Sequence, residues 1–233
     1  MTLAQAKELN SAVMTDAPLI GAPTKIARKS SNKDPLIFAD IYQEEVNIVT
    51  WQRDLPLSLK NSVSDFLDSN LTFKSNLTVT PKNVRSCLSE KLGSAEQAEL
   101  IENIAELVDI FCFLLETSHA GLRLSALDSA MCPKFHVDRV PCRLVTTYQG
   151  IATEWLPHHV VDRTKLGTGS NGLLDSESGL YQHPDDIQQL TCGDVALLKG
   201  ETWFNNENAG LVHRSPALSA GEVRLLLTLD LAI

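Results

Sequence analysis

The sequence has no apolar run long enough to cross a membrane and few aromatic residues, although 43% of its 233 residues are hydrophobic. A membrane-spanning helix needs about 20 consecutive apolar residues, so we expect no transmembrane segment. The N-terminus also lacks the basic start and apolar core of a secretory signal. These absences predict a cytoplasmic globular protein without a membrane partner.

Basic residues are scarce as well. The chain has 20 Lys and Arg against 29 Asp and Glu, which gives a net charge of −9. Nonspecific binding to nucleic acid needs positive charge to displace counterions from phosphates. We therefore expect no nucleic acid partner, and a substrate that is an unknown small molecule or protein.

The chain has too few cysteines, too widely spaced, for a disulfide-rich fold. Their number is odd, and reduced thiols are therefore expected. They are Cys87, Cys112, Cys132, Cys142 and Cys192.

The first half of the chain predicts a support region rather than a site. Residues 1–35 form a polar arm, and residues 36–121 mix β-prone runs with apolar residues at helical spacing. The clearest apolar stripe, within 101–115, predicts a helix packed against a sheet. We expect residues 36–121 to be a helical and mixed subdomain packed on the second half of the chain.

Residues 122–233 change to short β-prone runs, which predict a β-barrel or sandwich. One long polar connection, at about 158–185, interrupts them and is rich in Gly, Ser, Asp and His. So long a connection within a compact domain is typical of a functional lid or of a disordered insert. The fold class expected from both halves is α+β.

A metal site is predicted by three residues of this second half. His136 and Asp138 are two positions apart, so on a strand both side chains point to the same face. His213, in the last β-rich part, offers a third ligand. Two histidines and one carboxylate form the facial triad of non-haem iron(II) oxygenases, which leaves coordination positions open.

Alternatives to this site remain. The tripeptide of His136 and Asp138 also occurs by chance on ordinary surface strands. Cys132 and Cys142 flank it, and a cysteine with the triad would suit zinc. A zinc-storing or zinc-sensing protein, or a scaffold without metal, therefore stays open beside an enzyme.

The order of residues around the triad resembles the prolyl-hydroxylase-like members of the 2-oxoglutarate and iron(II) dioxygenase superfamily. Arg143, Gly150 and Thr153 follow the first pair, and Arg224 follows His213. The resemblance covers about residues 122–233. It implies a double-stranded β-helix, a jelly-roll or cupin-like barrel, in which His136, Asp138 and His213 hold Fe(II). It also implies an activity that hydroxylates or demethylates a substrate.

The same resemblance implies a site for 2-oxoglutarate. Arg224 lies eleven residues after His213 (224 − 213 = 11), where the superfamily has a basic residue for the distal carboxylate. A guanidinium suits this role because it donates two parallel hydrogen bonds. Leu226 stands where a hydroxyl residue is usual, so we expect Thr228 or Tyr148 to assist, with Arg143 a further cofactor-binding candidate. An ordinary half-exposed strand is the alternative interpretation of Arg224.

The stretch CPKFHVDRVPCRLVTTYQGIATEWL is also similar to a bacterial family catalogued only as a domain of unknown function. That similarity implies relatives over most of the chain. It names no substrate.

Overall fold

The computed structural model describes residues 28–93 and 96–231 of the chain. Most of the expected polar arm, residues 1–27, lies outside this part. None of the helices in the described ranges has the length and apolar character that a membrane span requires.

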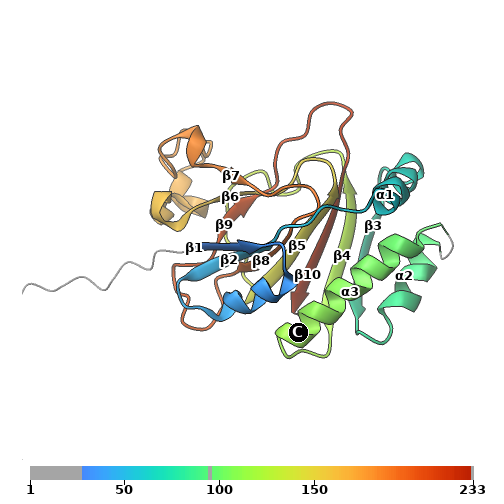
Figure 1. Ribbon diagram of the computed structural model, residues 1–233. Coiled ribbons are helices and arrows are strands. Elements are labelled where there is room, and N and C mark those ends of the chain that lie inside the picture. The colour runs from blue at the N-terminus through green and yellow to red at the C-terminus, as the bar shows by residue number, and fades with distance from the viewer. Residues whose placement is uncertain (1–27, 94–95, 232–233) are drawn as a thin grey trace, which may run out of the picture.

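The described residues form a seven-stranded sheet in the order β1-β2-β8-β5-β10-β4-β3 (Figure 1). β1 and β2 pair in parallel, and the other neighbours are antiparallel. Strands from both halves of the chain therefore share one sheet. Their bounds are β1 Arg28–Asn32, β2 Val46–Trp51, β3 Lys74–Val79, β4 Ala120–Leu127, β5 Cys142–Gln149, β8 Val195–Lys199 and β10 Arg224–Leu231.

A second, smaller sheet has the order β7-β6-β9, formed by Gln188–Gln189, Glu154–Leu156 and Val212–Arg214. An isolated bridge pairs His136 with His213 of β9. From β4 onward the chain thus passes repeatedly between the large sheet and the small one, with β6 and β7 consecutive in the small sheet. Within the described ranges, no strand ladder joins the two sheets.

Helices cover one face of the large sheet (Figure 1). They are α1 (Leu57–Ser69), α2 (Val84–Leu92) and α3 (Ala98–Leu114), and a 3-10 helix, η1 (Pro35–Tyr42), precedes β2. The apolar stripe of α3 is buried, which agrees with the helix predicted there. The fold is therefore α+β.

Side chains along β10 alternate between the helix-covered face of the large sheet and the opposite face. Leu225, Leu227 and Leu229 pack in the core cluster that contains the helices. Because successive strand residues point to opposite faces, Arg224 and Leu226 point toward the small sheet. Leu226 packs there with buried residues of β2, β5, β6 and β8.

The polar connection at 158–185 is folded as short 3-10 helices. They are η2 (His158–Val160), η3 (Arg163–Lys165), η4 (Gly167–Ser170) and η5 (Pro184–Asp186). Leu180 and Tyr181 of this insert pack against Phe135 and Val212, and the Phe135 amide donates to Asp175 Oδ2 over 2.8 Å. The insert therefore lies against the segments that carry His136 and His213.

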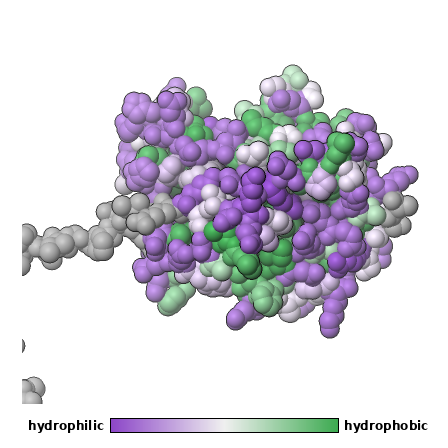
Figure 2. Space-filling model, viewed as in Figure 1, coloured by the Kyte–Doolittle hydropathy of each residue, from purple (hydrophilic) through white to green (hydrophobic). Residues whose placement is uncertain are grey.

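Hydrophilic side chains cover most of the face seen in Figure 2, with a smaller hydrophobic area near its lower centre. The large apolar side chains are mostly buried between the layers.

Candidate metal centre

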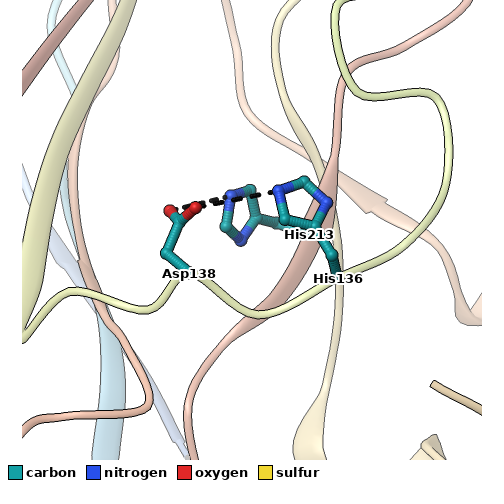
Figure 3. A group of neighbouring side chains, drawn as sticks. All are labelled: His136, Asp138 and His213. Atoms are coloured by element: carbon teal, nitrogen blue, oxygen red, sulfur yellow. Dashed lines mark ion pairs between the residues drawn. The ribbon is translucent and has the colours of Figure 1, made fainter. Parts of the chain in front are cut away.

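The backbone brings the two predicted histidine ligands together. His136 and His213 exchange two backbone hydrogen bonds of 3.0 Å each, and their ring centroids lie 4.6 Å apart. Asp138 follows two residues after His136 and turns its carboxylate toward both rings (Figure 3). One ligand atom from each residue lies within 4.8 Å of the others.

Hydrogen bonds to the backbone orient both imidazole rings. Nδ1 of His136 lies 2.9 Å from the carbonyl oxygen of Lys134, and Nδ1 of His213 lies 3.2 Å from that of Leu211. A carbonyl can only accept, so each Nδ1 carries the proton. Nε2 of a neutral ring then has a free lone pair, which is the arrangement of a metal-ligating histidine.

The two oxygens of Asp138 have different surroundings. Oδ1 accepts a hydrogen bond from Arg143 Nη1 over 2.7 Å, whereas Oδ2 is buried without a hydrogen-bond partner. Oδ2 lies 3.3 Å from His213 Nε2. A buried carboxylate oxygen without a donor is costly, and a cation would satisfy it. Two imidazole nitrogens and this oxygen fit the donor set of a facial iron(II) site.

The charges around Asp138 keep it ionised. Burial by itself raises the pKa of Asp138, but His213 in its protonated form and then Arg143 lower it to about 2. Burial lowers the pKa of His136, and His213 lowers it further. At neutral pH Asp138 is therefore ionised and His136 is neutral, so a metal would not have to displace a titratable proton from either side chain.

Arg143 is engaged by two carboxylates. Its Nε and Nη2 donate to Asp230 over 2.7 and 2.8 Å, while Nη1 holds Asp138. The sequence suggested Arg143 as a cofactor-binding residue. In the structure it donates a hydrogen bond to Asp138 and so orients that carboxylate.

Arg224 is completely buried and faces away from the helices. Its Nη2 donates to Thr153 Oγ1 over 2.7 Å and to Thr147 Oγ1 over 3.0 Å. Nη1 has no hydrogen-bond partner, and no carboxylate of the described residues pairs with this guanidinium. Burial lowers the pKa of Arg224 to about 10. An enclosed cation with a free donor is suited to an anionic ligand.

The structure separates the two hydroxyl residues expected beside Arg224. Tyr148 lies on the helix-covered face, where its hydroxyl donates to Asn103 Oδ1 over 2.9 Å. Thr228 lines the cavity beside the triad, but the hydroxyls that contact Arg224 belong to Thr147 and Thr153. Strand parity could have identified Thr147, because it shares a face with Arg143.

A cavity connects the triad with the surroundings of Arg224. Its lining includes His136 and His213 at the candidate metal position and Thr153, which contacts Arg224. Leu226 and Thr228 also line it. The same cavity therefore borders the two histidine donors and Thr153, whose hydroxyl contacts the buried Arg224.

Neither flanking cysteine belongs to the metal group found among the described residues. Cys142 is buried in the helix-side core, and burial raises the pKa of its thiol to about 12. Cys132 is exposed and lines the cavity, outside the group of three.

The chain is similar to solved structures of low sequence identity. The dioxygenase for auxin oxidation 1 from Arabidopsis thaliana, in a complex with 2-oxoglutarate, has a TM-score of 0.50 at 11% identity, over 88% of this chain and 92% of that one. The rice dioxygenase for auxin oxidation has a TM-score of 0.48 at 13% identity, over 79% of this chain and 72% of that one. The first of these likenesses shows structural similarity to 2-oxoglutarate and iron(II) dioxygenases at the level of fold.

A comparison with curated proteins gives no match. The family described as "Protein of unknown function (DUF1826)" matches residues 32–230. The chain belongs to the DUF1826 family.

Proposed function

We propose that the protein is an Fe(II)- and 2-oxoglutarate-dependent oxygenase that hydroxylates or demethylates a substrate. The observation that carries this proposal is the shared cavity. Two of the three grouped metal donors, His136 and His213, line it. Thr153, which holds the unpaired buried guanidinium of Arg224, lines it as well.

The strand order supports a double-stranded β-helix for the second half of the chain. β4, β5, β8 and β10 lie in the large sheet, and β6, β7 and β9 lie in the small one. The bridge at His136 adds an eighth segment on the small-sheet side. Eight segments divided equally between two sheets are the arrangement of a jelly roll.

His136, His213 and Oδ2 of Asp138 would hold the metal. Iron(II) bound here would supply oxidation of the substrate by dioxygen, coupled to conversion of 2-oxoglutarate to succinate and carbon dioxide. The protein residues contribute orientation and exclusion of water. Three protein ligands leave positions open for a chelating cosubstrate, whereas structural zinc sites close all four with protein.

Arg224 would bind the distal carboxylate of 2-oxoglutarate. Thr147 and Thr153 hold Nη2 and Nε, so the guanidinium has a fixed orientation while Nη1 remains available. A charge-assisted hydrogen bond in such an enclosed place contributes about 1.5 to 3 kcal/mol. The anion would also balance the buried positive charge.

The test is anaerobic reconstitution with iron(II) and 2-oxoglutarate, followed by visible absorption. We expect a charge-transfer band that needs both components and disappears in His136→Ala. His159→Ala is the control, because His159 is an exposed histidine of the insert. Tight zinc binding without any band or any 2-oxoglutarate binding would instead favour the zinc-storing or zinc-sensing alternative.

A further inference from the structure

A second cavity lies against His136, on the side of the insert. Its lining combines residues of η3 and η4 with the segment between β8 and β9, and the polar members are His136, Arg139, Arg163, Thr168, Glu201 and Asn208. His136 lines the first cavity as well. A molecule in the second cavity would therefore lie beside the candidate metal centre without occupying the surroundings of Arg224.

Arg163 is the unusual member of this lining. Its Nη2 donates to the carbonyl oxygen of Gly210 over 2.6 Å and lies 3.2 Å from His158 Nδ1. Its Nε is enclosed without a partner. Within the described ranges no carboxylate pairs with Arg163, and burial lowers its pKa to about 10.

Two other arginines near the site form ion pairs with carboxylates of the protein. Arg143 pairs with Asp138 and Asp230. Arg214 pairs with Glu154 over 2.6 Å and with Asp175 over 3.3 Å. The protein therefore neutralises these guanidinium groups with its own carboxylates, but leaves Arg163 without one.

A carbonyl oxygen satisfies one N–H of Arg163 but does not balance its charge. A partly buried cation without a counter-ion is unfavourable, and a ligand that brings an anion into the cavity would offset that cost. The one carboxylate of the lining, Glu201, lies 3.8 Å from the exposed Arg139. Arg163 is thus the cation of this cavity that has no carboxylate partner among the described residues.

We propose that Arg163 binds the anionic group of the substrate, a carboxylate, sulfonate or phosphate, in the cavity beside His136. That this anion belongs to a substrate rests on the proposed oxygenase function, whereas anion binding at Arg163 does not.

Fluorine NMR titrations test this on zinc-loaded protein saturated with N-oxalylglycine, an unreactive analogue of 2-oxoglutarate that keeps probes away from Arg224. The probes are para-fluorobenzoate, para-fluorobenzenesulfonate and para-fluorophenyl phosphate, with neutral para-fluorobenzamide for comparison. We expect at least one anion to bind about tenfold more tightly than the amide, which corresponds to one charge-assisted contact.

The variant Arg163→Gln should lose that preference, and Arg163→Lys should keep part of it because the charge remains. Arg139→Gln is the matched control, since Arg139 lines the same cavity but is exposed and lies near Glu201. Thermal melts establish that each variant is folded. Equal affinities for anions and amide, no binding of any anion, or full affinity in folded Arg163→Gln would overturn the proposal.

The same titration on metal-free Arg224→Ala separates this inference from the proposed function, because anion binding at Arg163 needs neither the metal nor Arg224. Suppose that reconstituted wild-type protein gives no charge-transfer band, but binding that depends on Arg163 persists in this variant. The cavity is then an anion site and the oxygenase assignment falls. If the band forms but no anion binds, the oxygenase stands and the role of Arg163 falls.

Discussion

Arg143 Nη1 donates to Oδ1 of Asp138 over 2.7 Å, so the oxygen that remains for a metal is Oδ2. Asp230 holds the other side of the same guanidinium with two hydrogen bonds. Asp138 is thereby restricted to ligation through one oxygen. A carboxylate that bound through both oxygens would occupy a position needed by a cosubstrate.

The first prediction concerns this restriction. In Arg143→Gln, Asp138 Oδ1 loses its charged donor, so both oxygens can reach the metal. We expect the visible spectrum of the cobalt(II)-loaded variant to shift toward higher coordination, and 2-oxoglutarate to bind roughly tenfold more weakly, as is typical for loss of a partner of a metal ligand.

Arg123→Gln is the control, because Arg123 pairs with Asp230 but does not touch Asp138. An unchanged cobalt spectrum in folded Arg143→Gln would mean that Arg143 does not set the mode of ligation.

Much of the metal site can be predicted from local sequence rules. The two-residue spacing of His136 and Asp138 predicts a shared face. The positions of Arg224, Thr228 and Asp230 relative to the leucines predict the two faces of β10, although Leu226 shares the polar face. Long-range register cannot be predicted from such rules. Asp230 lies opposite Arg143 only because β10 and β5 pair in one particular register.

The position of Tyr148 has a related cause. Once Arg143 is placed on the inner face of β5, parity excludes Tyr148 from that face and includes Thr147. The contact of Thr153 with Arg224 depends on the turn at Gly150, whose shape no periodicity encodes. The packing of the insert against Phe135 is likewise a tertiary contact between residues distant in sequence.

The second prediction concerns Arg224. Arg224→Ala should weaken 2-oxoglutarate binding by roughly tenfold to a hundredfold, since a loss of ~1.4 kcal/mol is one decade of affinity. Arg224→Lys should give an intermediate defect because it keeps the charge but loses the fork. Calorimetry on manganese-loaded protein measures this, and metal affinity should change little. Equal 2-oxoglutarate affinity in wild type and Arg224→Ala would remove Arg224 from the proposed site.

The third prediction concerns the hydroxyl that holds Arg224. Thr153→Val removes a 2.7 Å hydrogen bond, which should weaken 2-oxoglutarate binding by about fivefold, equivalent to roughly 1 kcal/mol. Thr146→Val is the control, because its buried hydroxyl has no hydrogen-bond partner. Thr146→Val should therefore leave binding unchanged and leave stability equal or slightly higher. A similar loss of binding in both variants would contradict the role of Thr153.

The fourth prediction concerns the turn after β5. Gly150 has φ +87°, and a Cβ there would lie 2.8 Å from the carbonyl oxygen of Val223 and 3.1 Å from Cα of Arg224. Gly150→Ala should lower the free energy of unfolding by about 1 to 3 kcal/mol. Gly221→Ala has a similar φ of +84° but no atom within 4 Å, so denaturant melts should show a smaller loss. Equal losses would mean that backbone strain alone, and not the contact with β10, matters at Gly150.

The fifth prediction concerns the insert at 158–185. Its short 3-10 helices contain few of the repeated hydrogen bonds that protect amides, so hydrogen exchange should be faster there than in β5 and β10. Addition of 2-oxoglutarate to the metal-loaded protein should slow this exchange if the insert gates the site. Exchange that is already slow without ligand, or unaffected by it, would show that the insert is a fixed wall.

The backbone bridge between His136 and His213 has a consequence for how such a site is assembled. The two residues are far apart in the chain, yet main-chain amides and carbonyls, which every substitution except proline retains, hold them side by side. The two histidine ligands would therefore already be in position before a metal ion binds, and the ion would not have to bring them together. Loading this protein with metal is thus a matter of occupancy, in contrast to small domains that fold only around their ion.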